Sequence, residues 1–479
     1  MAKRHRSEAT PFTANLVIGS GDYGQATVDD APGYKCVPIR RRRHGLLFAS
    51  LHVSDSKIQL AEERFIELPF HPQWLATAPA APEGNGSTTK AFYVAAGDDD
   101  MLHAIDGSSY QVESSMDALG GSAYVELSTP DWTGGAKWAL CANYGSGVLS
   151  VLPLFARGAL KEPAGRVECL DSGYHTRTID PPTDSKQPWP LEGFDPKLAD
   201  RQEACHPHQI VLVYGYNDQK NERLTWALAC DLGADRVWTY EFDDRRGSLI
   251  GAVNSAQHLK LPAGSGPRHL VLLGEGKNGQ LRSYQRDLLV CVACELSGEL
   301  ALCKFDTTHG KWNVLSTVDA MAGSGVTCSR SHHSGLSHIA ASYSERYEYT
   351  IIYVASRTDN AIVAFRLERN GNAESFVGAS TLTFVQRVST KGVCTRHFAI
   401  INRPSEQAAG SSGGGGEEEE PVALVLGNQD SQTLVAYHIE PSDGTLREEG
   451  AAELKVLGVC PACIVRQCVE PSREEDGPL

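Results

Sequence analysis

The segment LACDLGADRVWTY, residues 228–240, joins two apolar runs through a short polar turn. In its continuation RVWTYEF (236–242), Trp238, Tyr240 and Phe242 alternate with Val237, Thr239 and Glu241, which is the two-residue period of a β-strand. Helical periodicity is hard to find anywhere in the chain. The segment therefore predicts an antiparallel hairpin, and the fold depends on how often that hairpin recurs.

The same pattern of strand, polar turn and strand occurs five more times. The copies are VAAGDDDMLHAI (94–105), LCANYGSGVLSVL (140–152), VACELSGELALCKF (292–305), VASRTDNAIVAF (354–365) and LGNQDSQTLVAY (426–437). We align the copies on the polar residue after the small pair, which gives Gly97, Asn143, Asp231, Glu295, Arg357 and Gln429. A unit that recurs at uneven spacing indicates a structural repeat with loop insertions.

Most of these hairpins follow another strand that begins with a polar step, as in HPHQIVLV (206–213) and GPRHLVLL (266–273). Each unit therefore reads as a four-stranded antiparallel sheet. Such sheets in series, with no helical layer to cover them, suit a β-propeller. We expect an all-β, seven-bladed β-propeller of four-stranded antiparallel blades. Its seventh blade would combine strands near the N-terminus (14–24 and 44–53) with the terminal run PACIVRQCV (461–469). The alternative is a pair of β-sandwiches.

The domain prediction is a single propeller over residues 13–468, with disordered tails at 1–12 and 469–479. Two insertions interrupt it. Residues 172–202 are rich in proline and polar side chains, and residues 403–421 are a low-complexity run of glycine and glutamate. We interpret both as loops that leave the blades.

Composition narrows the function classes. The formal net charge of −15 argues against a nucleic-acid partner, whose binding surface would be basic. Thirteen cysteines without a compact spacing framework, and a start without an apolar signal core, predict reduced thiols in a cytoplasmic protein. No window approaches 18 uninterrupted apolar residues, so we expect no membrane association. The sequence leaves the oligomeric state open.

Several short motifs resemble chemical signatures. GSSGG (410–414) matches G-x-S-x-G and GEGKNG (274–279) matches G-x-G-x-x-G, but neither has the strand-to-helix context that these motifs need. Two C-x-x-C pairs, Cys291 with Cys294 and Cys460 with Cys463, are compatible with zinc only if a turn brings the thiols together. We expect neither a metal ion nor a cofactor.

A propeller brings the starts of its inner strands to one channel mouth, so polar residues from different repeats can converge there. The candidates are His208, Arg268, Glu295, Arg357 and Arg396. Arginine offers a rigid fork of donors that matches carboxylate and phosphate. Several arginines at one mouth therefore indicate a small anionic ligand.

These residues also carry a family resemblance. RQEACHPHQIVL (201–212), GSGPRHLVL (264–272), CELSGEL (294–300), ASRTDNAIVAF (355–365) and TRHFAI (395–400) resemble motifs of the seven-bladed β-propeller lactonases. That family includes bacterial-type 6-phosphogluconolactonases and the fungal 3-carboxy-cis,cis-muconate lactonizing enzyme. The resemblance runs in order from about Trp74 to Tyr437.

The resemblance implies a catalytic group of one histidine, two arginines and one glutamate. The matching positions are His208, Arg268, Glu295 and Arg357. His206 matches a position that the phosphogluconolactonase-like members share, which favours that branch. His206, His269, Arg396 and Gln429 are the candidate substrate contacts.

The resemblance thus implies a metal-independent lactonase that hydrolyses an anionic sugar lactone, as 6-phosphogluconolactonase does. His208 would be the general base, and the arginines would bind the substrate and stabilise the developing oxyanion. The same residues could instead close a lactone from a carboxylate, as the muconate enzyme does. A third possibility is a non-catalytic propeller that serves as a binding platform, because a fold alone does not imply activity.

Overall fold

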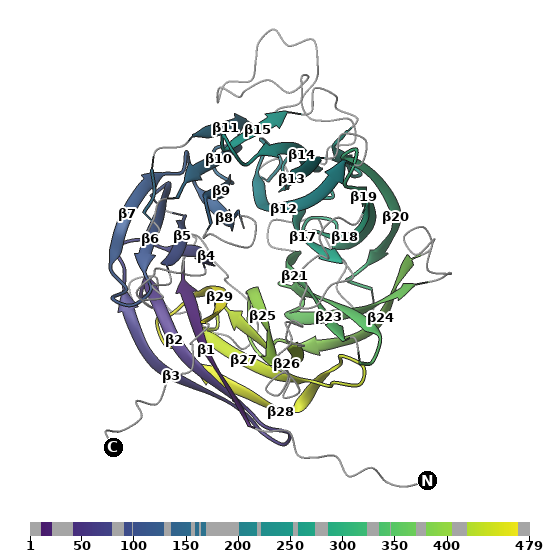
Figure 1. Ribbon diagram of the computed structural model, residues 1–479. Helices are drawn as coiled ribbons and strands as arrows, with labels where there is room; N and C mark the ends of the chain where they lie inside the picture. Colours follow the sequence, from purple (N-terminus) through teal and green to yellow (C-terminus); the bar gives the residue numbers. More distant parts are fainter. Residues whose placement is uncertain are drawn as a thin grey trace, which may run out of the picture.

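The chain folds into a ring of seven antiparallel β-sheets around a common central axis (Figure 1). We call the region along this axis the channel. The computed structural model describes residues 11–21, 42–78, 91–97, 99–128, 136–154, 159–161, 164–168, 201–217, 222–251, 257–273, 286–322, 335–344, 346–369, 380–404 and 419–467. Within these ranges the regular elements are the strands β1 to β29. The predicted all-β, seven-bladed propeller is confirmed.

We number the blades 1 to 7 around the ring, beginning with the blade that contains β4 to β7. Blade 1 comprises β4 (Pro72–Ala78), β5 (Ala91–Ala96), β6 (Met101–Asp106) and β7 (Val112–Asp117). Blade 2 comprises β8 (Ser122–Leu127), β9 (Trp138–Asn143), β10 (Val148–Pro153) and β11 (Gly165–Glu168). Blade 3 comprises β12 (Pro207–Asn217), β13 (Glu222–Asp231), β14 (Arg236–Asp243), β15 (Ser248–Gly251) and the short β16 (Leu259–Lys260).

Blade 4 comprises β17 (Pro267–Leu273), β18 (Asp287–Cys294), β19 (Glu299–Asp306) and β20 (Lys311–Asp319). Blade 5 comprises β21 (Leu336–Ser344), β22 (Tyr349–Ser356), β23 (Ala361–Arg369) and β24 (Ser380–Ser389). Blade 6 comprises β25 (Thr395–Pro404), β26 (Glu419–Asn428), β27 (Thr433–Ile439) and β28 (Leu446–Lys455). Blade 7 comprises β29 (Pro461–Gln467), β1 (Phe12–Ser20), β2 (Gly45–Val53) and β3 (Ile58–Glu67).

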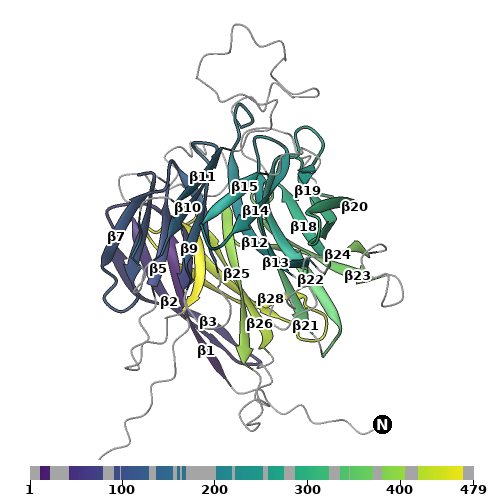
Figure 2. The ribbon, with the colours of Figure 1, turned by 45° about the horizontal axis from the view of Figure 1, so that its top comes forward.

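Blade 7 closes the ring with strands from both ends of the chain, as the sequence predicted. Strand β1 pairs with β2 on one side and with the C-terminal β29 on the other, and Ile18 lies opposite Ile464. Strands β3 and β28 lie side by side in both views (Figures 1 and 2), so blade 7 also contacts blade 6 along its outer strands. The first and last strands of the ring therefore hold one another through a hydrogen-bonded ladder, whose register shifts once, between Gly19 and Ser20.

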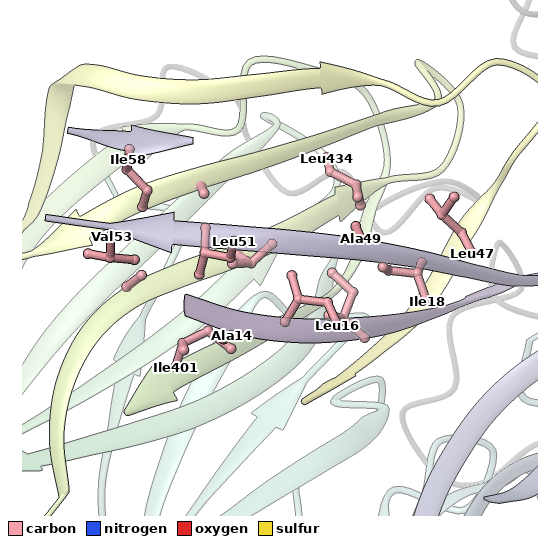
Figure 3. Packing of buried hydrophobic residues seen from close by; sticks show 14 of the residues in the cluster. Ala14, Leu16, Ile18, Leu47, Ala49, Leu51, Val53, Ile58, Ile401 and Leu434 are labelled. Carbon is pink, nitrogen blue, oxygen red and sulfur yellow. The ribbon is translucent and has the colours of Figure 1, made fainter. Parts of the chain in front are cut away.

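Among the described residues, seven large hydrophobic clusters each fill the space between two neighbouring blades. A small eighth cluster pairs Leu232 with Leu296. Figure 3 shows one of the large clusters, in which Leu16 and Leu51 of blade 7 pack beside Ile401 and Leu434 of blade 6. A side chain buried in this way contributes roughly 1.5–3 kcal/mol to folding. Each blade is thus covered on both faces by its neighbours, which explains why no helical layer is needed.

The turn between the second and third strands is nearly the same in blades 1 to 6. It contains a residue with positive φ in each case: Asp100, Gly147, Asp235, Gly298, Asn360 and Gln432. Five of these six residues are glycine, aspartate or asparagine, which tolerate this left-handed conformation, and Gln432 of blade 6 is the exception. The polar turn that recurs in the sequence is therefore the local signal that ends one strand and begins the next.

Strand pairing corrects the alignment of the repeats. The last residues of the second strands lie opposite the first residues of the first strands, and they are Ala96, Asn143, Asp231, Cys294, Ser356 and Asn428. Asn143 and Asp231 are therefore not equivalent to Glu295 and Arg357. The equivalent residues are Tyr144 and Leu232, one position later, because backbone register rather than polarity decides which side chain reaches the channel.

The described ranges reach parts of the predicted insertions and tails. Strand β25 ends at Pro404 and β26 begins at Glu419, so both ends of the predicted 403–421 loop belong to strands. Arg201 and Gln202 also lie in the described chain, in the turn before β12. Residues 172–200, 405–418 and 469–479 lie outside the described residues, as do residues 1–10 of the tail predicted at 1–12. Phe12, the last residue of that predicted tail, begins β1. No helix in the described part is long and apolar enough to span a membrane.

We expect closure by β29 to be a major source of stability. Ile464 is 2% exposed, so Ile464→Ala removes buried apolar surface from the closing strand and should lower the free energy of unfolding by about 2–4 kcal/mol. Leu457→Ala is the matched control, because Leu457 is 74% exposed near the same strand, and its effect should stay within about 0.5 kcal/mol. Equal effects in urea unfolding would show that closure does not depend on this packing.

Candidate functional site

The strand registers explain why the polar side chains converge. In β12, β17 and β25 the pairing shifts beside the second residue, and these residues are His208, Arg268 and Arg396. A β-bulge of this kind leaves one residue outside the ladder and redirects its side chain. Glu295 and Arg357 are the residues that directly follow β18 and β22, so they lie in the turns after those strands. Bulge and turn therefore supply side chains to the same channel from successive blades.

Glu295 is the centre of the cluster. Its side chain is 1% exposed, and Oε1 lies 2.6 Å from Nη2 of Arg201 and 2.7 Å from Nη2 of Arg357. Oε2 lies 2.8 Å from Nε of Arg268. Burial alone would raise the pKa of Glu295, but the guanidinium groups of Arg357, Arg201 and Arg268 outweigh burial and hold it far below the ordinary value. Glu295 is therefore a carboxylate throughout the physiological pH range.

A glycine lets the next blade approach this carboxylate. Gly335 has a φ of +136°, and a Cβ atom there would lie 1.6 Å from the carbonyl oxygen of Glu295. The carbonyl oxygen of Gly335 in turn accepts a hydrogen bond of 3.1 Å from the amide of Arg357. The backbone at Gly335 thereby fixes Arg357 against Glu295.

His208 lies beside the cluster as a neutral imidazole. Nε of Arg268 donates a hydrogen bond of 3.0 Å to Nε2 of His208. Oε2 of Glu295 is in ionic contact with the same Nε but lies outside the direction of that hydrogen bond. An accepting Nε2 places the proton of the neutral ring on Nδ1. Burial, with the charges of Arg268, Arg396 and Arg357, lowers the pKa of His208 well below its ordinary value.

His206, the other histidine of HPH, makes different contacts. Its Nδ1 lies 2.8 Å from the carbonyl oxygen of Tyr144, and its Nε2 lies 2.8 Å from Oε1 of Glu203. Its ring stacks on that of Tyr144 at 4.4 Å between centroids. Burial lowers the pKa of His206, but the Glu203 carboxylate and the Tyr144 carbonyl outweigh burial, and the net shift is upward. His206 thus holds Tyr144 in place through its stacked ring and its contact with the Tyr144 carbonyl.

The other predicted substrate contacts, Arg396, Gln429 and His269, have different surroundings in the structure. Arg396 is near enough to lower the pKa of His208 through its charge. The side-chain amide of Gln429 donates a hydrogen bond of 2.8 Å to the carbonyl oxygen of Gly21, so it links blade 6 to the closing strand. His269 lies in contact with Trp74, with ring centroids 5.5 Å apart. The His269 ring also lies 5.2 Å from that of His208 between centroids. Arg396 and His269 therefore lie near His208, whereas Gln429 contributes to ring closure.

Trp74 closes the channel beside the cluster. Its ring contacts Tyr124 of blade 2, His269 of blade 4, His338 of blade 5 and His397 of blade 6. A side chain from blade 1 that contacts blades on the opposite side of the ring must lie across the channel axis. Nδ1 of His269 and Nδ1 of His338 are also 3.0 Å apart. We call these five side chains the channel plug.

Two residues of the site were missed by the sequence reasoning. Arg201 was assigned to the end of an insertion, although it stands in RQEACHPHQ, one of the family-like segments. Tyr144 was missed because the repeats were aligned on the preceding polar residue, Asn143. Asn143 instead ties blade 2 to the segment that leads into it from blade 1, because its amide donates to the carbonyl of Ala118 at 2.5 Å and to the hydroxyl of Ser150 at 3.1 Å. Strand pairing, which was not visible in the sequence, is the signal that separates these neighbours.

No group of three or more His, Cys, Asp or Glu side chains in the described chain is arranged to hold a metal ion. Cys291, Cys294, Cys460 and Cys463 are buried free thiols. The GEGKNG and GSSGG motifs (274–279 and 410–414) lie outside the described residues. The described side chains near Glu295 and His208 comprise four guanidiniums, one carboxylate and one neutral imidazole, a set that favours an anionic ligand.

Comparisons with known proteins agree with this fold. A family model described as "Lactonase, 7-bladed beta-propeller" matches residues 57–408. The curated 6-phosphogluconolactonase of Bacillus subtilis (strain 168) is 25% identical over 262 residues, which cover 55% of this chain and 56% of that protein. The match thus spans about half the length of that relative.

Two solved structures share the fold. A putative 6-phosphogluconolactonase from Bacteroides fragilis superposes with a TM-score of 0.58 at 17% identity, covering 95% of this chain and 98% of that one. A periplasmic gluconolactonase from Pseudomonas aeruginosa gives a TM-score of 0.56 at 19% identity, covering 96% and 100%. At these identities the likeness shows the architecture alone.

The buried imidazoles predict that the protein loses stability in acid. Burial lowers the pKa of His208, His269, His338 and His397, the last to about 3. Below pH about 6.5 these histidines become protonated in the unfolded chain but stay neutral in the folded protein. The free energy of unfolding therefore decreases as the pH falls. Each such ring contributes a slope of up to about 1.4 kcal/mol per pH unit. His206, with its raised pKa, opposes this trend.

The measurement is urea unfolding at intervals from pH 7.5 to pH 5. In His397→Gln, the slope of the free energy of unfolding against pH should correspond to about one proton less than in the parent chain. The variant lacks one imidazole that is protonated only after unfolding. An unaltered slope in this variant would contradict the assignment of a neutral His397.

Proposed function

Because the chain belongs to the family of seven-bladed β-propeller lactonases, we propose that it is a metal-independent hydrolase of an anionic sugar lactone of the 6-phosphogluconolactone type. The observation that carries the proposal is the Glu295 cluster, in which arginines from different segments surround one buried carboxylate beside a neutral imidazole. Guanidiniums in this number bind an anionic substrate and stabilise the negative charge that develops on a lactone carbonyl.

His208 acts as the general base in this proposal. Nε of Arg268 lies between Nε2 of His208, at 3.0 Å, and Oε2 of Glu295, at 2.8 Å. If the N–H of Arg268 turns toward Glu295 or toward the substrate oxygen, the lone pair of His208 becomes available. The lowered pKa of His208 keeps that lone pair unprotonated at neutral pH.

The hydrolysis then follows ordinary acyl chemistry. The oxygen of a water molecule bonds to the lactone carbonyl carbon, and one proton of the water passes to Nε2 of His208. The electron pair of the carbonyl moves to its oxygen, where Arg268, the arginine in contact with His208, stabilises the charge. The ring C–O bond breaks as the carbonyl re-forms, and the leaving alkoxide takes the proton back from the imidazolium. The product is the open-chain acid.

The protonation states favour hydrolysis over lactone closure. Adding a carboxylate across an alkene requires an acid that delivers a proton to carbon. The three arginines keep Glu295 ionised, and burial with neighbouring positive charge keeps His208 neutral. Neither group therefore holds an acidic proton for that step. Glu295 acts as the fixed counter-ion that positions Arg201, Arg268 and Arg357.

We also propose that the protein works in a reducing compartment such as the cytoplasm. The cysteines of the described chain are free thiols, among them Cys141, Cys230 and Cys303. Free thiols persist where the surroundings keep them reduced.

A side-by-side assay tests the reaction. Purified protein should accelerate hydrolysis of 6-phosphogluconolactone above the spontaneous rate, and the rate should persist after dialysis against a chelator, because the scheme uses no metal. 3-Carboxy-cis,cis-muconate should keep its absorbance under the same conditions. Loss of the lactonase rate in chelator would refute metal independence, and consumption of the muconate alone would establish the cyclase reaction instead.

Replacing the base tests its role. His208→Gln should lower kcat on 6-phosphogluconolactone by about 100-fold or more. In the parent enzyme the acid limb of kcat/KM should lie well below pH 6.5, because a base with a lowered pKa is protonated only in stronger acid. The exposed His52→Gln is the matched control and should leave both measurements unchanged. An acid limb at or above pH 6.5 would remove His208 as the base.

A further inference from the structure

We propose that Arg201 and Tyr144 recognise the phosphate of the substrate and give the enzyme its preference for a phosphorylated lactone over the neutral one. This inference rests on the proposed lactonase function, and it gives a role to the two site residues that the sequence repeats did not reveal. The substrate would lie with its carbonyl at Arg268 and His208 and its phosphate at Arg201.

The first argument is depth within the cluster. The Arg201 side chain is 21% exposed and that of Arg357 is 17% exposed, whereas Arg268 is 3% exposed. All three contact Glu295, so their exposure orders them from the solvent side to the buried side. Arg268 lies at the buried side with the proposed base His208, where the bond is broken. Arg201 is the group that an incoming anion meets first.

The second argument is the convergence of two guanidiniums. Nη2 of Arg201 and Nη2 of Arg357 lie 2.6 Å and 2.7 Å from the same oxygen, Oε1 of Glu295. Two guanidiniums that meet at one oxygen stand close enough to share a second anionic group. A phosphate has several acceptor oxygens and can contact both forks, whereas a neutral hydroxymethyl group gains no charge-assisted bond.

The third argument is the support of Tyr144. Nε of Arg201 lies 3.4 Å from the hydroxyl oxygen of Tyr144. The Tyr144 ring stacks on His206, which is itself held by Glu203 at 2.8 Å. The ring also meets His208 edge-on at 5.6 Å between centroids. Tyr144 therefore stands between the proposed base and Arg201, and its hydroxyl is placed to donate to an anion held by Arg201.

The geometry assigns different tasks to the two sides of Glu295. Oε2 faces Arg268, which contacts the base, and Oε1 faces Arg201 and Arg357. One carboxylate thereby spaces the reacting end of the site from its anion-binding end. Loss of Arg201 should weaken recognition of phosphate while Arg268 and His208 keep their own contact.

The test compares 6-phosphogluconolactone with glucono-1,5-lactone on Arg201→Gln. The ratio of kcat/KM for the phosphorylated lactone to that for the neutral lactone should fall on the order of 10- to 100-fold, mostly through KM, because a charge-assisted contact to phosphate is lost. Arg201→Lys should recover part of the ratio, and Tyr144→Phe should lower it by a smaller factor. An equal loss on both lactones, with the ratio unchanged, would overturn the proposal.

Calorimetric binding of the products separates this inference from the proposed reaction. The parent protein should bind 6-phosphogluconate more tightly than gluconate, and Arg201→Gln should remove the difference. If neither lactone is hydrolysed but this difference depends on Arg201, the reaction is wrong and the recognition stands. If the difference persists in Arg201→Gln and Arg201→Lys, both with a parent-like Tm, the recognition is wrong.

Arg447→Gln serves as the matched control. Arg447 also pairs with a glutamate, Glu440, but this pair lies on the outer part of blade 6. The variant removes an arginine–carboxylate pair of the same kind and should leave the substrate ratio at the parent value. A shift as large as that of Arg201→Gln would show that general charge, rather than the position of Arg201, sets the preference, and would overturn the proposal.

Discussion

The ladder between β1 and β29 holds the two ends of the chain together, and the channel exists because this ladder closes the ring. Each hydrophobic cluster needs two neighbouring blades, so an open ring would leave one face of blade 6 and one of blade 1 without a partner. Closure also reaches the channel mouth directly. The amide of Gln429 holds the carbonyl of Gly21 beside the end of β1. A residue expected to touch substrate thus contributes to the closure that shapes the site.

Within that ring, the electrostatics of the site depend on a single buried carboxylate. Glu295 compensates Arg201, Arg268 and Arg357, which could not lie so close together without it. Burial, with the charges of Arg268, Arg396 and Arg357, lowers the pKa of His208 and keeps its ring neutral, and a neutral imidazole is what a general base requires. Trp74 and the other side chains of the channel plug close the channel across its axis. Charge, protonation and access are therefore set by residues from different blades.

Much of this was predictable from the sequence because its signals are local. The two-residue period and the polar turns indicated strands, and six copies of the hairpin indicated a propeller with a shared seventh blade. The motifs also indicated His208, Arg268, Glu295 and Arg357 as one group, and the structure brings these four together. Arg201, Tyr144 and the structural use of Gln429 were not predictable, since each depends on a partner from a distant segment.

The sequence by itself determined the strand pattern, the repeat, the closure of the ring and the residue types available at the channel mouth. The tertiary structure alone decided which side chains meet there. A shift of one residue in strand pairing places Tyr144 rather than Asn143 at the mouth, and bulges redirect His208, Arg268 and Arg396. The physical reason is that side chains alternate along a strand, so hydrogen-bond register, which is fixed only when the strands pair, determines the face on which each residue lies.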